Sequence, residues 1–485
     1  MNKPLRRVAI FCGILVLALL IRDNWLQYVR ADELNSHKLN KRVEIERYAH
    51  ERGNIIVDGA PITGSEETDD EYYKYKRTYT DGPLWAPVTG YASQVFGANQ
   101  IEKLEDGILS GNSDQLFFDR TMAMFTGDKK KGGNVVTTLK GAAQKAAFKG
   151  LGDKKGAVAA IDPRTGKILA LASTPSYDPS AFAGRLKDDE KAWVANNKDS
   201  DKPMLNRALR ETYPPGSTFK VLTAAAALEN GKVTDIDAAT DTPEPYILPG
   251  TRTPMVNHAQ GCENASLNRA MEVSCNSVFA KLGDDVTRDK MVEMAEKFGF
   301  NNAEIDTPVR AASSVYDKNM SRDGNAQSSI GQFNTAATPL QMAMVTAAIA
   351  NDGKLMKPYM IDKLESPDLE VIQQNEPEEM SRPISGENAQ LLQQMMENVV
   401  ERGTGSNAAI PGVKVGGKTG TAQHGENNSK NPYAWFISYA KDDNGSPVAV
   451  AVVVEDSNAR RDDISGGGLA APIAKAVMKA VLDEK

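Results

Sequence analysis

The segment Pro214-Pro215-Gly216-Ser217-Thr218-Phe219-Lys220 joins a chain-breaking stretch to a helix-forming one. Two prolines and a glycine end the preceding element, and residues 218–228 then lack both residue types and are rich in alanine and leucine. The pattern predicts a helix that begins at Ser217. Residues i and i+3 share a helix face, so the Ser217 hydroxyl and the Lys220 amine can meet. A lysine serves as base to a serine when desolvation or another cation lowers its pKa.

A second polar group stands downstream, at Ser274-Cys275-Asn276, after the helical pattern of residues 267–273. Two polar side chains two positions apart on a loop can project into one cleft. Serine and asparagine are also preferred helix caps, so a purely structural role stays open for this motif taken alone.

The third group is Lys418-Thr419-Gly420-Thr421, the only K-T-G in the chain. Val413 and Val415 give its approach a β-strand character. A strand at the border of a cleft can offer backbone N–H groups to an extended peptide, and Gly420 lets that peptide come close. Lys418 is the candidate second cation that lowers the pKa of the other lysine.

An oxyanion hole requires two backbone N–H groups near the nucleophile. The sequence offers those of Ser217 and Thr421, and losing one such donor typically reduces the rate about 10²- to 10³-fold. The three motifs together suit the opening of a peptide bond through a serine ester without histidine.

Two further copies of the patterns occur. Ser438 and Lys441 form a second S-x-x-K, but they lie in an alternating strand pattern, where positions i and i+3 face opposite sides. Ser110-Gly111-Asn112 repeats S-x-N ahead of Ser217, so it does not fit the order of the three motifs. We therefore predict that neither copy is catalytic.

The apolar runs on either side of this region indicate one sheet built from both ends of the domain. Residues 157–161 and 168–172 form a strand-turn-strand pattern, and residues 434–440 and 448–454 flank the hairpin signal Asp443-Asn444-Gly445. A helix is predicted over 469–482. The long helical stretch between these strands predicts an inserted helical subdomain.

Other parts of the chain carry weaker signals. Asp58-Gly59 before Pro61 predicts a hairpin. Residues 78–148 hold no cluster of catalytic residue types, which favours a spacer domain. Residues 365–383, with three prolines and many acids, are predicted to be a surface loop.

The N-terminus predicts a membrane segment. Lys3, Arg6 and Arg7 precede the unbroken apolar run of residues 8–21. The run suits a cleaved signal peptide, or an uncleaved anchor that continues through Tyr28. We favour the anchor because a small-x-small cleavage site is poor here, and the basic start predicts a cytoplasmic N-terminus.

Composition is that of a globular protein, with 41% hydrophobic and 25% charged residues among 485. A net charge of −7 without a basic patch argues against nucleic-acid binding. Cys262 and Cys275 are either free buried thiols or a disulfide, which an oxidising exterior permits. His258 and His424 are interpreted as ordinary polar residues, and we expect no metal and no cofactor.

The motif set S-x-x-K, S-x-N and K-T-G resembles that of penicillin-binding proteins and serine β-lactamases. With Tyr213-Pro214-Pro215-Gly216, Gly331-Gln332 and Gly466-Gly467-Gly468, the chain is more narrowly similar to monofunctional class B penicillin-binding proteins of actinobacteria. The resemblance implies an α/β (α+β) transpeptidase fold, with an antiparallel sheet flanked by helices and an all-helical subdomain. It further implies a cytoplasmic tail and anchor over 1–30, an elongated pedestal of the dimerisation type over 31–150, and a transpeptidase domain over 151–485.

The same resemblance implies residue roles. Ser217 attacks the penultimate D-Ala carbonyl of a stem peptide, and Lys220 takes its proton. Ser274 relays a proton to the leaving D-Ala, and Asn276 binds the peptide amide and holds Lys220. In the K-T-G-T motif, Lys418 sets the local electrostatic potential. Substrate or β-lactam binds at Thr419, Gly420 and Thr421.

The implied partners are donor and acceptor stem peptides, β-lactam antibiotics, the membrane, and a glycosyltransferase or other proteins of the division or elongation machinery. A β-lactamase is disfavoured, because no E-x-x-L-N follows Asn276. A bifunctional enzyme is disfavoured, because only about 120 residues separate anchor and transpeptidase regions. A D,D-carboxypeptidase and a weakly catalytic divisome scaffold stay open.

Overall fold

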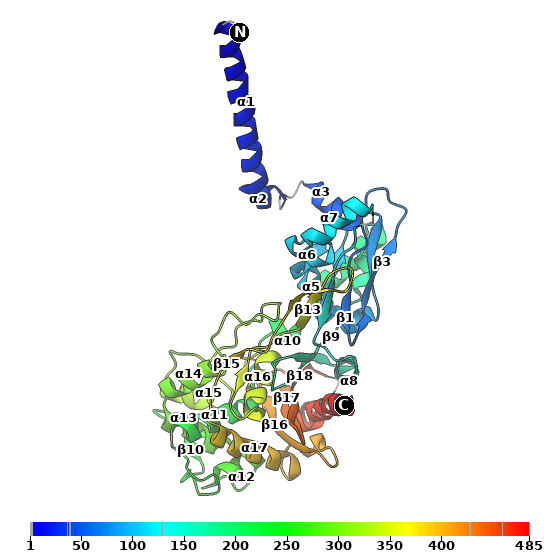
Figure 1. The fold of residues 1–485 in the computed structure, drawn as a ribbon. Helices are drawn as coiled ribbons and strands as arrows, with labels where there is room; N and C mark the ends of the chain where they lie inside the picture. The colour runs from blue at the N-terminus through cyan, green and yellow to red at the C-terminus, as the bar shows by residue number, and fades with distance from the viewer. Residues whose placement is uncertain are drawn as a thin grey trace.

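The computed structural model describes residues 3–35, 37, 40–127, 130–425, 428–457 and 459–484. Figure 1 shows three parts in sequence: a lone helix α1 at the N-terminus, a smaller α/β pedestal, and a larger unit that carries the C-terminus. Each part follows from a different sequence pattern.

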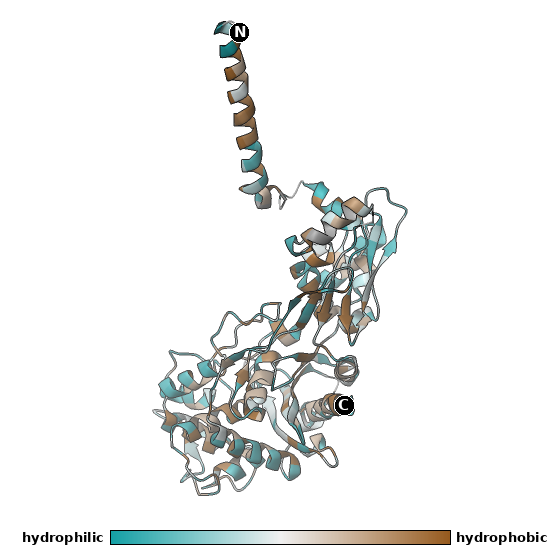
Figure 2. Cartoon of the chain, viewed as in Figure 1, coloured by the Kyte–Doolittle hydropathy of each residue, from teal (hydrophilic) through white to brown (hydrophobic). Residues whose placement is uncertain are grey.

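Helix α1 spans Lys3–Tyr28 and is followed by the short helix α2, Ala31–Asn35. Its 26 residues extend about 39 Å at 1.5 Å per residue, more than the hydrocarbon core of a bilayer. Mean hydropathy reaches 2.2, and Figure 2 shows the apolar band along its length. Within the described residues it is the one helix long and apolar enough to span a membrane. A signal sequence meets the same test, so retention of the helix stays a prediction.

The pedestal centres on a sheet that has, within the described chain, the strand order β14-β13-β7-β1-β2. Strands β1, Ile55–Val57, and β2, Ala60–Pro61, form the predicted hairpin around Asp58-Gly59. Both turn residues have positive φ, at 48° and 74°, as a two-residue hairpin of this kind requires. The other pedestal elements are α3 Lys41–Tyr48, β3 Thr63–Glu67, β4 Tyr75–Tyr79, α4 Gly82–Thr89, β5 Ala92–Ser93, β6 Gly97–Ala98, α5 Gln100–Leu104, α6 Asp106–Leu109, α7 Phe117–Thr126 and β7 Asn134–Thr137.

The predicted surface loop over residues 365–383 is wrong. Strand β13, Ile361–Glu365, pairs antiparallel with β7 of the pedestal, and β14, Val371–Gln374, pairs with β13. Strand β15, Glu379–Ser381, pairs with β12, Leu355–Met356. The two strands within this range, β14 and β15, are short and have few buried residues, so acids and prolines mask their pattern. The chain thus returns to the pedestal from far downstream, and the division at residue 150 stays a proposal.

The larger unit is built on a sheet whose strands, among the described residues, run in the order β16-β17-β18-β8-β9. All neighbours pair antiparallel, and β18 joins the late strands to the early ones through pairs such as Val452↔Val158. The predicted assembly from both ends is confirmed. The strands are β8 Lys155–Ile161, β9 Ile168–Thr174, β16 Lys414–Ala422, β17 Tyr433–Asp442 and β18 Gly445–Asp456.

Helices cover both faces of this sheet. Successive side chains of a strand point to opposite faces, and the apolar ones on each face pack against a different set of helices. Val158 and Ala160 belong to a core shared with α8, Gly141–Leu151, and α18, Ala471–Asp483. Ala157 and Ala159 belong to the opposite core, shared with α16, Pro339–Ala350, and the inserted helices. Those helices are α10 Arg207–Arg210, α11 Lys220–Glu229, α12 Leu267–Val273, α13 Asn276–Val286, α14 Arg288–Lys297, α15 Arg322–Ser328 and α17 Gly386–Glu401, with the two-residue strands β10 Tyr246–Ile247 and β11 Pro254–Met255. Helix α9, Lys187–Lys198, packs instead on a small separate cluster that contains Phe182.

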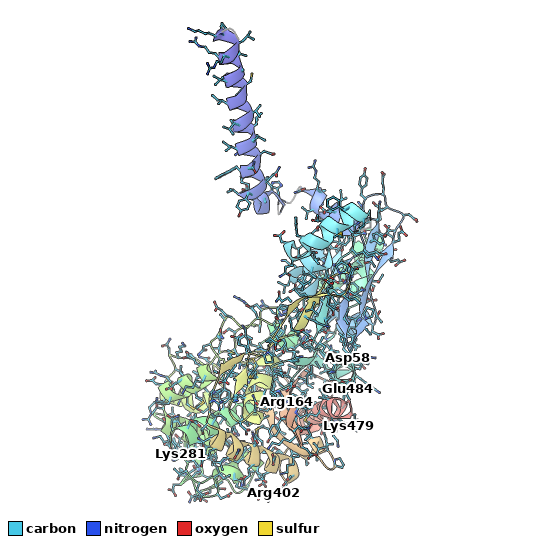
Figure 3. All side chains as sticks on the ribbon, in the orientation of Figure 1. Asp58, Arg164, Lys281, Arg402, Lys479 and Glu484 are labelled. Carbon is cyan, nitrogen blue, oxygen red and sulfur yellow. A yellow bond between two sulfur atoms is a disulfide. The ribbon has the colours of Figure 1, made fainter. Side chains whose placement is uncertain are left out.

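Pedestal and larger unit meet at the N-terminus of α8. The Asp58 carboxylate of the β1–β2 turn accepts from the Gly141 N–H at 2.6 Å, and the Glu484 carboxylate accepts from the Ala142 N–H at 3.3 Å. Figure 3 shows these two acidic side chains close together. Both place negative charge at the positive end of the helix dipole, which is stabilising.

Candidate active site

Ser217 lies in a 3-10 turn, η3 Gly216–Phe219, that leads into α11. Gly216 has φ +52°, and its N–H donates to the Gly331 carbonyl at 2.9 Å. A Cβ on Gly331 would stand 2.1 Å from the Gly216 carbonyl oxygen, so a side chain cannot fit there. The backbone contact between Gly216 and Gly331 therefore holds the nucleophile in place.

Replacing Gly331 with alanine is expected to slow acylation of Ser217 by about 10²-fold, because the added methyl pushes the Gly216 backbone, and displacements near 1 Å have costs of that order. The measurement is the second-order rate constant for acylation of Ser217 by benzylpenicillin. Gly386→Ala is the control, since its Cβ would lie 3.8 Å from the nearest atom, the Asp352 carbonyl oxygen. Equal rates for both variants would contradict the positioning role.

Lys220 is the first residue of α11 and is fully buried. Its Nζ donates to Asn276 Oδ1 at 2.7 Å and to the Ser274 carbonyl at 2.8 Å, and it lies 3.1 Å from Ser274 Oγ. Burial, and secondly the positive charge of Lys418, hold the pKa of Lys220 well below its usual range.

The hydrogen-bond pattern suits an amine that handles protons. A neutral amine has two N–H donors and one lone pair, and the Asn276 and Ser274 carbonyl oxygens use both donors. The lone pair is then free to accept a hydroxyl proton. Among the described residues, no hydrogen bond joins the Ser217 hydroxyl to Lys220, and the hydroxyl that contacts the amine is that of Ser274.

The second motif stands between two helices. Ser274 ends α12 with left-handed φ and ψ of 66° and 46°, an uncommon conformation for a residue other than glycine. Asn276 begins α13, where its N–H donates to Asn257 Oδ1 at 2.6 Å and its Nδ2 donates to the Val256 carbonyl at 2.7 Å. Asn257 thus caps α13 and fixes Asn276, a role that the sequence did not reveal.

Cys275, at the centre of this motif, is joined to Cys262 by a disulfide. The sequence allowed free buried thiols or a disulfide, and the structure contains the disulfide. The bridge ties the loop that carries Asn257 to the residue between Ser274 and Asn276. The disulfide restrains the backbone on either side of Cys275, and thereby Ser274 and Asn276.

The third motif occupies β16, an edge strand of the sheet. Lys418 is fully buried, its Nζ donates to the Thr419 carbonyl at 3.1 Å, and burial lowers its pKa to about 7. Thr419 Oγ1 lies 2.6 Å from Thr404 Oγ1. A side chain at Gly420 would be crowded, since a Cβ would lie 3.0 Å from the Pro215 carbonyl oxygen. Thr421 is exposed at the open edge.

A cleft of about 660 Å³ brings the motifs together. Its walls include Ser217, Ser274, Asn276 and the segment Thr419–Thr421, whereas the fully buried Lys220 and Lys418 are not among the lining residues. The cleft is also lined by residues that motif reasoning missed or left without a role: His258, Thr404, Gln423, Arg461, Ser465, Gly466 and Gly467.

Both rejected motif copies lie outside this cleft. Ser438 is buried in β17 with its hydroxyl unpartnered, and Lys441 pairs with Glu397 at 2.8 Å. Ser110 ends α6 in the pedestal. Within the described residues, no group of three or more His, Cys, Asp or Glu side chains has the arrangement of a metal site. A serine, a buried lysine of lowered pKa and an edge strand define a serine acyl-transfer site.

Comparison with known families agrees with this class. The family described as the penicillin-binding protein transpeptidase domain matches residues 156–479, and the dimerisation domain of penicillin-binding protein A matches residues 52–135. The chain belongs to the class B penicillin-binding protein family, and within it to the PbpA type.

Individual relatives support this assignment. The chain is 39% identical, over the full length of both chains, to "Peptidoglycan D,D-transpeptidase PbpA" of Mycolicibacterium smegmatis, and 38% identical to the Mycobacterium tuberculosis protein of that name over 99% of both chains. Penicillin-binding protein A from M. tuberculosis in its ceftriaxone acyl-enzyme complex has a TM-score of 0.85, with 38% identity over 90% of this chain and 100% of that chain. Its penicillin G acyl-enzyme has a TM-score of 0.83, with 38% identity over 89% and 100%.

Proposed function

We propose that the protein is a peptidoglycan D,D-transpeptidase that cross-links stem peptides through an acyl-enzyme on Ser217 and is inactivated by β-lactams. The observation that carries this proposal is the fully buried Lys220, whose lowered pKa and contact with Ser274 supply a base where Ser217 lines the cleft. The related penicillin-binding protein A of M. tuberculosis forms acyl-enzymes with ceftriaxone and penicillin G, which supports the same chemistry here.

In acylation, Ser217 attacks the carbonyl of the penultimate D-Ala, and its proton passes to the neutral amine of Lys220. Ser274, 3.1 Å from that amine, passes a proton on to the nitrogen of the leaving D-Ala. Bond formation at the carbonyl and expulsion of the amine therefore share one proton path. Asn276 keeps Lys220 in place and offers an amide to the bound peptide.

Strand β16 holds the substrate. Its edge is open for an extended peptide to pair with, and the N–H groups of Ser217 and Thr421 are the proposed oxyanion donors. The hydroxyls of Thr419 and Thr421 bind the terminal carboxylate, and Lys418 adds positive potential beneath them. An amine from a neighbouring stem peptide then takes the acyl group.

The setting we propose is the outer face of the cell membrane. Helix α1 supplies an apolar span that fits membrane anchoring. The basic residues ahead of it favour a cytoplasmic N-terminus, which puts the pedestal and the active site outside. A glycosyltransferase that makes the glycan strands, or another protein of the division or elongation machinery, is the partner class this arrangement requires.

The test is the fate of the acyl group on the full-length protein. Benzylpenicillin is expected to add its mass to the wild type and to remain for hours, whereas rapid return to the unmodified mass would indicate a β-lactamase. A donor peptide ending in D-Ala-D-Ala, given with an amine acceptor, is expected to yield the cross-linked product. Release of the free acid alone would instead establish a D,D-carboxypeptidase, and no turnover at all would favour a scaffold.

A further inference from the structure

One cation faces the cleft without a counter-charge. Arg461, in the turn η6 Arg461–Asp463, is the only side chain with a formal charge among the described residues that line the cleft. It donates to three neutral acceptors: Gln423 Oε1 at 3.1 Å, the Asn428 carbonyl at 2.7 Å and the Lys430 carbonyl at 2.5 Å. Within the described part of the chain it forms no ion pair.

The donor count leaves room for a ligand. A guanidinium has five N–H donors, and these three bonds use three of them. The bonds fix the side chain between the β16–β17 connection and the segment after β18, so its charge is held in place before any ligand arrives. A fixed guanidinium with free donors is well suited to a carboxylate.

The position of Arg461 relates it to one part of the substrate. Gln423, which accepts from Arg461, follows directly on the last residue of β16, two positions after Thr421. On the proposed function, the hydroxyls of Thr419 and Thr421 bind the terminal carboxylate of the donor, and the Thr421 N–H meets the carbonyl that Ser217 attacks. The part of the donor that precedes the acyl D-Ala therefore extends past Thr421, towards Gln423 and Arg461.

We infer that Arg461 is a specificity-determining residue that binds an anionic group, a carboxylate, on the donor peptide at the residue before the acyl D-Ala. The inference rests on the proposed function, since the direction of the bound donor comes from it. The same site would favour β-lactams whose acyl side chain carries a carboxylate over those that lack one.

The test compares two penicillins that differ in this group. Carbenicillin has a carboxylate on the carbon beside the side-chain carbonyl, where benzylpenicillin has none. Second-order acylation constants are measured by intact mass on the full-length wild type, Arg461→Gln and Arg461→Lys. Arg460→Gln is the matched control, because Arg460 is the exposed neighbour and does not line the cleft.

Arg461→Gln is expected to lower the carbenicillin constant about tenfold more than the benzylpenicillin constant, a factor of the size expected for one charge-assisted hydrogen bond. Arg461→Lys should retain part of the preference, and Arg460→Gln all of it. Equal loss for both compounds would show that Arg461 only holds the β16–β17 connection, and no loss for either compound would likewise overturn the inference. Failure of benzylpenicillin to acylate the wild type would refute the proposed function, and this inference with it.

Discussion

Full-length protein with Ser217 replaced by alanine is expected to gain no mass from benzylpenicillin, while the wild type becomes fully acylated. The hydroxyl is the only group in the proposed mechanism that forms a bond to the substrate carbonyl. Loss of such a nucleophile typically lowers turnover by about 10⁶-fold. Because the hydroxyl makes no hydrogen bond within the described structure, its removal should leave the fold unchanged.

Ser438→Ala is the matched control for this variant. Ser438 belongs to the second S-x-x-K, is fully buried and has an unpartnered hydroxyl. Its replacement should therefore keep full acylation and leave the free energy of unfolding equal or slightly higher. An adduct that persists in Ser217→Ala would place the nucleophile elsewhere and overturn the mechanism.

Replacing Lys220 with methionine is expected to slow acylation by about 10²- to 10⁴-fold, the usual contribution of a general base. Methionine fills the buried space without a charge. In the wild type the active form of Lys220 is the neutral amine, so the acylation rate should rise as pH increases through its lowered pKa and then level off. The rate constant for benzylpenicillin between pH 5 and about 9 measures both effects.

Two further variants test whether the pH dependence comes from Lys220 and whether Lys418 lowers its pKa. Lys441→Met removes the lysine of the rejected motif, which pairs with Glu397, and should leave the rate profile unchanged. Lys418→Met removes the positive charge that lowers the pKa of Lys220, so the rising part of the profile should move to higher pH. Movement to lower pH, or a Lys220→Met rate equal to the wild type, would contradict the base role.

The main sheet and the candidate site could be predicted from the sequence because both depend on patterns of residues that are close together in the chain. The hairpin of β17 and β18 follows from alternating apolar residues around Asp443-Asn444-Gly445, and the position of Ser217 follows from the glycine and prolines before a helix. The three motifs reach one cleft because the sheet joins strands from both ends of the larger unit.

What could not be predicted depends on contacts between distant residues. The cap that Asn257 places on α13 and the contact of Gly331 with Gly216 join segments with no shared pattern. Arg461 enters the cleft only because β18 ends beside β16–β17, and no motif marks it. The strands β13 and β14 were missed because both are short, β14 is mostly exposed, and neither shows a clear alternation.

The pairing of β13 with β7 has a consequence for how the protein can be divided. The polypeptide crosses between pedestal and catalytic unit and then crosses back, so one cut near residue 150 does not separate two complete folding units. A fragment that starts there would keep β13 without β7, with an unpaired strand edge of the kind that promotes aggregation. The two units therefore need to be expressed as one chain, and a tilt of the pedestal is passed to the catalytic unit through several covalent connections.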